Sequence, residues 1–153
     1  MTTGEVLESS TREASGVFPH SLRRPIYWGA VVGVFQAASP VGFRWLDQDV
    51  VWAISLAIIA AVYIGFAVAD GRRHVVTVEV GVASAFVLLA TVAIDAPWLI
   101  VVGLVGHGLK DLWQHRTHFV ANTRWWPPFC LVVDFVCASL IAILLLAGVD
   151  LNG

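Results

Sequence analysis

Residues 128–149 have the sequence PFCLVVDFVCASLIAILLLAGV, in which Asp134 is the only charged side chain. About 20 predominantly apolar residues are the length that an α-helix needs to cross the hydrocarbon core of a bilayer. This stretch therefore predicts a transmembrane helix, and it places one carboxylate inside that helix.

The rest of the chain has the same apolar character. Hydrophobic residues make up 58% of the 153 residues and charged residues only 13%, whereas a soluble domain is about one quarter charged. Four more spans of similar length can be placed, at 26–43, 50–69, 75–94 and 97–113. We therefore expect an all-α integral membrane protein, a bundle of about five transmembrane helices within a single domain over residues 25–150. The first span is the weakest, because Gln36, Ser39 and Pro40 interrupt it.

The distribution of Lys and Arg predicts the orientation, since cytoplasmic loops carry an excess of both. With a cytoplasmic N-terminus and an outer C-terminus, Arg44 alone lies outside and eight cations lie inside: Arg12, Arg23, Arg24, Arg72, Arg73, Lys110, Arg116 and Arg124. We interpret them as topology signals and anchors for anionic membrane lipids, not as a nucleic-acid site. The expected location is the inner (plasma) membrane, with several passes.

Residues 1–24 are polar, and we expect them to form a flexible cytoplasmic tail. They lack the short apolar core of a secretory signal peptide, so we expect the tail to be retained. The two cysteines, Cys130 and Cys137, lie about two helical turns apart, which predicts packing and no disulfide between them. Glycine-rich phosphate loops, C-x-x-C pairs and nucleophile elbows are absent from the sequence.

Three ionisable residues recur at intervals of four: His107, Asp111 and His115. At about 100° per residue, each step of four turns the side chain by about 40°, so the three share one stripe of the helix. Ionisable groups at this depth are costly and usually face the interior of a bundle or a water-filled cavity. The stripe is therefore the predicted functional site.

Two further acids are expected at a similar depth. At about 1.5 Å per residue, Glu79 lies roughly 9 Å and Asp134 roughly 10 Å from the cytoplasmic ends of their spans, close to the level of His107. These residues predict a polar chamber open to the cytoplasm, which Tyr63 and Gln36 could join. Three glycines near the histidine allow either close helix packing or room for a ligand: Gly103, Gly106 and Gly108.

Imidazole and carboxylate groups suit divalent iron, zinc or manganese, and helical bundles build metal centres from such residues on facing helices. The metal hypothesis takes His107, Asp111 and His115 as ligands. Asp134 completes the shell or acts as a catalytic base, and Glu79 is a second carboxylate. Two alternatives stay open: a hydrogen-bonded network that holds the helices together, and a metal-free acid–base site.

The spacing of these histidines and aspartates loosely resembles the histidine motifs of membrane-bound non-haem iron oxygenases and desaturases. The adjacent histidine pairs of those families are missing from this sequence. The resemblance therefore implies a type of chemistry and gives no residue a role.

The segment 115–128 mixes aromatic and basic residues, as is typical of a belt in the lipid headgroup layer. The functional alternative is a lid that admits an amphiphilic substrate, with Arg116 or Arg124 holding an anionic head.

Together these patterns predict a small membrane enzyme, metal-dependent or not, that acts on a lipid or isoprenoid-like substrate. With iron and an electron donor it would be an oxidoreductase; without metal it would be an isomerase or cyclase. The alternatives are proton- or cation-coupled transport and an accessory role in an oligomer or membrane complex. Polar residues become sparse in the spans beyond Glu79 and Asp134, which favours a pocket over a channel.

Overall fold

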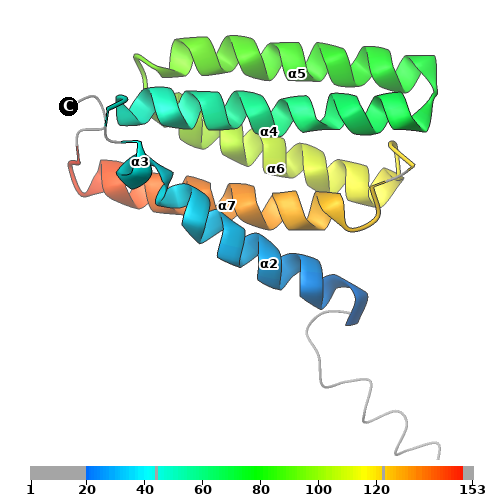
Figure 1. Cartoon of the computed structure of the whole chain (residues 1–153), viewed down its shortest axis with the longest axis horizontal. Coiled ribbons are helices and arrows are strands. Elements are labelled where there is room, and N and C mark those ends of the chain that lie inside the picture. Colours follow the sequence, from blue (N-terminus) through cyan, green and yellow to red (C-terminus); the bar gives the residue numbers. More distant parts are fainter. Residues whose placement is uncertain (1–19, 44, 122, 150–153) are drawn as a thin grey trace, which may run out of the picture.

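The computed structural model of the chain describes residues 20–43, 45–121 and 123–149, and these residues form helices and connecting turns without strands. The helices, in chain order, are α2 (His20–Ala37), α3 (Ser39–Gly42), α4 (Gln48–Asp70), α5 (Arg73–Ala93), α6 (Trp98–Thr117) and α7 (Trp126–Leu146) (Figure 1). The all-helical fold class is therefore confirmed.

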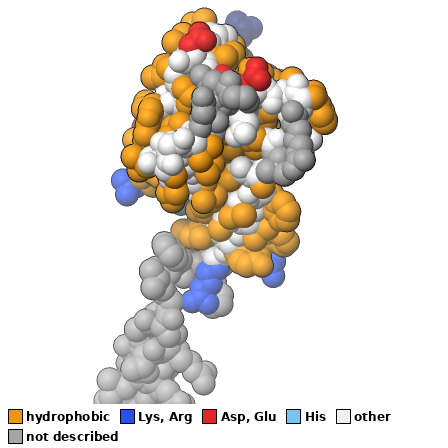
Figure 2. Space-filling view, turned by 90° about the vertical axis from the view of Figure 1, so that its left-hand side faces the viewer, with side chains coloured by type: hydrophobic (Ala, Val, Ile, Leu, Met, Phe, Trp, Pro, Cys, Tyr) orange, Lys and Arg blue, Asp and Glu red, His pale blue; other side chains and the backbone are white. Residues whose placement is uncertain are grey.

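Three of the helices, α4, α5 and α7, are long and apolar enough to cross a membrane. The other two long helices lie where the sequence predicted spans but are more polar. The first five residues of α2 include a histidine and two arginines, and α6 carries Lys110, Asp111 and Arg116. Large hydrophobic side chains are exposed along the bundle, and Figure 2 shows them covering much of the face at the α3 end. Apolar surface of this extent is typical of contact with lipid or with a partner protein.

The long helices pack side by side (Figure 1). Helices α4 and α5 form a hairpin, α6 packs against both of them and against α7, and α2 packs on the far side of α7. The apolar core between α4, α6 and α7 contains side chains that are at most 1% exposed, among them Trp52, Leu56, Ile100, Leu104 and Ile141.

The first predicted span differs from the structure at both ends. Helix α2 begins at His20, so residues 20–24, which the sequence analysis assigned to a flexible tail, are helical; residues 1–19 of that tail lie outside the described residues. At its other end α2 stops at Ala37, and α3 restarts the chain with Pro40 in its first turn. The break follows from Pro40, because a proline has no backbone N–H to donate to the carbonyl four residues earlier, and its ring clashes with that carbonyl.

Two glycines set the distance between α2 and α7. A Cβ on Gly29 would lie 2.6 Å from the backbone oxygen of Phe129, and a Cβ on Gly33 would lie 2.9 Å from the Cβ of Val136. The close approach also lets Cys137 Sγ donate to the Gly33 oxygen at 3.3 Å. Small residues four apart are a common means of close helix packing in membranes.

A polar clamp joins two turns at the end of the bundle where α4 meets α5. Asp70 Oδ2 accepts hydrogen bonds from Ala121 N and Arg72 Nη2, both at 2.8 Å, and Arg72 Nη2 also donates to the Phe119 oxygen at 2.7 Å. Gly71, at φ 79°, closes α4 in the left-handed conformation that glycine adopts without strain. The hydrogen bond to Asp70 raises the pKa of the Arg72 guanidinium above its ordinary value.

Candidate functional site

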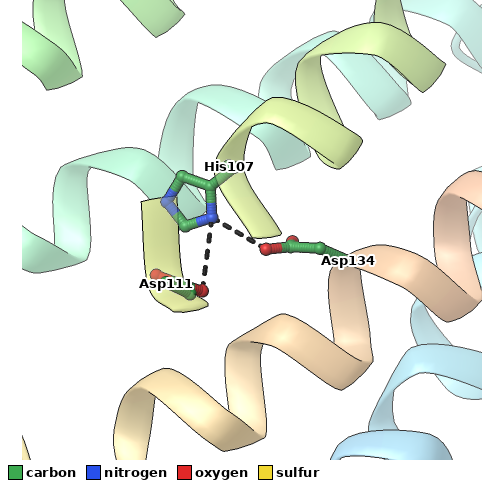
Figure 3. A group of neighbouring side chains, drawn as sticks. All are labelled: His107, Asp111 and Asp134. Atoms are coloured by element: carbon green, nitrogen blue, oxygen red, sulfur yellow. Dashed lines mark hydrogen bonds and ion pairs between the residues drawn. The ribbon is translucent and has the colours of Figure 1, made fainter. Parts of the chain in front are cut away.

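His107, Asp111 and Asp134 meet inside the bundle, with His107 and Asp111 on α6 and Asp134 on α7 (Figure 3). His107 Nδ1 lies 2.8 Å from Asp134 Oδ2 and 3.6 Å from Asp111 Oδ2, and all three side chains are 0% exposed. One potential ligand atom from each residue lies within 4.8 Å of the other two. We refer to these three residues as the central cluster.

Helix periodicity and one glycine explain why these side chains meet. Asp111 follows His107 by four residues, so both lie on the same face of α6. A Cβ on Gly108 would lie 3.0 Å from the Phe135 ring and 3.4 Å from Asp134 Cβ. The missing side chain therefore lets α7 come close enough for Asp134 to reach His107.

The other two glycines of the predicted site differ from each other. A Cβ on Gly103 would lie 2.6 Å from Leu56 Cδ2, so this glycine serves the packing of α6 on α4. A Cβ on Gly106 would meet no atom within 4 Å.

Several polar atoms of the central cluster lack a hydrogen-bond partner among the described residues: His107 Nε2, both carboxylate oxygens of Asp111 and Asp134 Oδ1. A buried polar atom without a partner costs about 1–3 kcal/mol, so such atoms are rare and point to an ion or water. The cluster therefore has ligand atoms to offer beyond its internal hydrogen bond.

The donor set fits a small divalent ion. Ligand bonds of about 2.0–2.2 Å in a tetrahedral zinc site place the ligand atoms roughly 3.4 Å apart. The two distances from His107 Nδ1, 2.8 and 3.6 Å, bracket that value. One imidazole and two carboxylates also suit manganese and ferrous iron.

A second polar layer lies next to the central cluster, toward the end of the bundle that carries the clamp. Lys110 Nζ lies 2.8 Å from Glu79 Oε2 and 3.5 Å from the centroid of the Tyr63 ring. The two atoms of the ion pair are close but not aligned as a hydrogen bond. Gln114 Nε2 donates to the other oxygen of Glu79, and the Glu79 and Lys110 side chains are only 1% and 11% exposed.

The structure divides the predicted site residues into three groups. It brings His107, Asp111 and Asp134 together, and it pairs Glu79 with Lys110 in the second layer. His115 lies outside the central cluster, half-buried, with its ring centroid 6.4 Å from that of His118.

The geometry of an α-helix explains the position of His115. Seven residues after His107 the helix returns to within about 20° of the same direction, whereas eight residues after it the direction is about 80° away. The buried face of α6 therefore includes Gln114 and does not include His115.

Sequence analysis missed two residues of the site and misplaced a third. Lys110 was counted among the cations of the cytoplasmic face, but the structure encloses it against Glu79 and Tyr63. The sequence spacing indicates both residues. Lys110 follows His107 by three residues and Gln114 follows it by seven, and both spacings place a side chain near the His107 face of the helix. Gln36, expected near the site, instead lines a cavity of about 470 Å³ between the α2–α3 break and α4, together with Phe43 and other apolar residues.

The central cluster has to be interpreted from its own geometry. Its residues come from helices whose fold and packing are described above, and its chemistry rests on their donor atoms. Comparisons of the chain with protein-family models, with curated proteins and with solved structures found no match.

Proposed function

We propose that this chain is an integral membrane protein that binds one divalent transition-metal ion through His107, Asp111 and Asp134. The observation that carries the proposal is the convergence of three fully buried ligating side chains that retain unpartnered atoms. A metal ion bound through His107 Nδ1 would give unpartnered carboxylate oxygens of Asp111 and Asp134 a partner, and its binding energy would stabilise the packing of α6 on α7. Zinc, manganese and ferrous iron are the ions that this donor set favours.

The proposal includes a placement in the membrane. All five long helices cross the bilayer, including the more polar α2 and α6. The described arginines at the start of α2, at the α4–α5 turn and around the α6–α7 loop lie at one end of the bundle, which supports a cytoplasmic position for that end. The N-terminus is then cytoplasmic and the C-terminus lies outside, in an inner (plasma) membrane.

A reaction on a lipid or isoprenoid-like substrate would follow from metal binding. The ion would polarise a substrate oxygen as a Lewis acid. The ligands have no exposed surface, so a substrate has to enter between helices that move apart. Metal binding is therefore the first step to test, and an enzymatic activity depends on it.

The second candidate function is a proton or cation relay. Gln114, Glu79 and Lys110 form a polar column between the clamp end of the bundle and the central cluster. On the other side of His107, α6 contributes the buried apolar side chains of Leu104 and Ile100. Polarity on one side only favours a site where an ion stays bound over a path through the membrane.

The metal content of the purified protein tests the proposal. The protein is purified in mild detergent with a tag that does not bind metal, loaded with zinc, manganese or ferrous iron, and analysed by mass spectrometry for metal per chain. Wild type is expected to hold about one ion per chain, and His107→Ala and Asp134→Asn are expected to lose it. His74→Ala removes an exposed histidine as the matched control and should keep the ion.

Two results contradict the proposal. One is a folded wild-type protein that stays free of metal after loading with each of the three ions. The other is equal metal content in wild type, His107→Ala and Asp134→Asn. Flux of the same ions into vesicles that contain the protein would instead support the relay.

A further inference from the structure

The buried charges around the central cluster have a defined sum. Metal binding requires ionised carboxylates and a neutral imidazole. In that state Glu79, Asp111 and Asp134 contribute three negative charges, Lys110 contributes one positive charge and His107 contributes none. The net charge of the buried group is then −2, which one divalent ion neutralises.

We propose that Lys110 sets this charge and thereby makes the site selective for divalent over trivalent ions. The inference rests on the proposed metal function and adds a residue that determines its specificity. Lys110 is a positioning residue in this scheme, because its ammonium acts through its field and does not bind the ion.

The contacts of Lys110 hold its charge inside the bundle. A lysine side chain is long enough to reach toward the membrane surface and commonly does so. Here Nζ instead lies 2.8 Å from Glu79 Oε2 and 3.5 Å from the Tyr63 ring centroid, and the side chain is 11% exposed. Three helices, α4, α5 and α6, thus contribute to fixing one ammonium group.

Glu79 is held as firmly as Lys110. Gln114 donates to one of its oxygens and Lys110 Nζ contacts the other, so both oxygens are engaged away from the central cluster. Glu79 is therefore the charge partner of Lys110 and not a further ligand. Two other carboxylates have little exposed surface and lie elsewhere. Asp49 is in the first turn of α4, at the opposite end of that helix from Tyr63, and Asp70 is paired with Arg72 in the clamp.

The size of the effect on ion selectivity follows from the short distance between Lys110 and the ligands. Lys110 Nζ lies 3.5 Å from the centroid of the Tyr63 ring, and that centroid lies 5.8 Å from the centroid of the His107 ring. The ammonium is therefore no more than about 9 Å from the imidazole of the central cluster. At a separation of roughly 8 Å and an effective dielectric constant of about 20, one unit of charge changes the relative affinity for a trivalent and a divalent ion by at least tenfold.

The experiment compares the affinities for Zn²⁺ and Tb³⁺ of metal-free protein in detergent, measured by titration calorimetry and terbium luminescence. Lys110→Met removes the positive charge, and the affinity ratio is expected to shift at least tenfold toward Tb³⁺. Glu79→Gln removes a negative charge, and the ratio is expected to shift by a similar factor toward Zn²⁺. The double variant restores the charge of −2, and its ratio should return to within about threefold of wild type.

Two controls separate charge from structure. Lys110→Arg keeps the charge, so its ratio should match wild type even if the packing around Tyr63 changes. If Lys110→Met does not fold, Glu79→Gln and Lys110→Arg still test the inference. The two single variants add a direct test, because the charge scheme predicts opposite shifts of the affinity ratio in Lys110→Met and Glu79→Gln, whereas a purely structural role predicts that breaking the buried pair from either side disturbs the site in both.

The outcomes distinguish the two proposals. If wild type binds Zn²⁺ but the ratio of Tb³⁺ to Zn²⁺ affinity is unchanged in Glu79→Gln and Lys110→Met, the role of Lys110 is overturned. The proposed metal site is not affected by that result. Wild type that binds no divalent ion overturns both.

Discussion

Replacing Gly29 with alanine is expected to weaken the packing of α2 on α7. The new Cβ would lie 2.6 Å from the backbone oxygen of Phe129 and 3.0 Å from the Cβ of Val132. A backbone oxygen and a Cβ cannot turn aside as the tip of a flexible side chain can. Among the described helices, α7 is the only long one against which α2 packs, so the strain has to be relieved by moving α2.

The change in the free energy of unfolding depends on two opposing effects. Alanine is favoured over glycine inside a helix by roughly 0.5–1 kcal/mol, while overfilling a packed interface costs about 1–3 kcal/mol. At Gly65 a Cβ meets no atom within 4 Å, so Gly65→Ala shows the gain alone. The free energy of unfolding of Gly29→Ala should therefore fall below that of Gly65→Ala by about 1–3 kcal/mol.

The assay is reversible unfolding in mixed detergent micelles with increasing sodium dodecyl sulfate, followed by tryptophan fluorescence. Gly33→Ala, whose Cβ would lie 2.9 Å from that of Val136, should behave as Gly29→Ala does. If Gly29→Ala unfolds at the same or a higher detergent fraction than Gly65→Ala, the close approach of α2 and α7 is wrong.

Three further predictions concern the site, the clamp and the orientation. His115→Ala should keep the metal content of wild type, measured by mass spectrometry, because His115 lies outside the central cluster. A loss as large as that of His107→Ala would instead show that His115 is a ligand, as the sequence predicted. Asp70→Asn removes the carboxylate that accepts from the Ala121 amide, so exchange of that amide with deuterium should become faster, and an unchanged rate would show that the clamp is open in solution. A thiol introduced by Arg124→Cys should react with a membrane-impermeant reagent from the cytoplasmic side only, and labelling from outside in intact cells would reverse the proposed topology.

The positions of the helices could be predicted because apolar length and flanking polar residues define them. The predicted spans 50–69 and 75–94 correspond to Gln48–Asp70 and Arg73–Ala93 in the structure. The start of α2 could not be predicted in the same way, because four of the five residues 20–24 are polar and no apolar boundary marks the first turn. The pairing of α2 with α7 is indicated in the sequence by two glycines four residues apart, Gly29 and Gly33. The sequence analysis did not use this spacing.

Depth along the helices predicted the site better than helix rotation did. Counting residues placed His107 and Asp134 at one level, and the structure joins them at 2.8 Å. Rotation decided the rest: it selected Gln114 over His115 and turned Lys110 inward against Glu79. That choice depends on which helices are neighbours, and the sequence of a single chain does not contain this information in a local pattern.

The partnership of α2 with α7 has a consequence for biosynthesis. Among the described long helices, a ribosome makes α2 first and α7 last, whereas the α4–α5 hairpin can form as soon as its two adjacent helices have been made. Helix α2 therefore keeps its two glycines uncovered until α7 has been made. Chains that stop before residue 126 lack the long helix that covers this surface in the described part of the structure, so quality-control proteases that recognise unpaired helices should remove them.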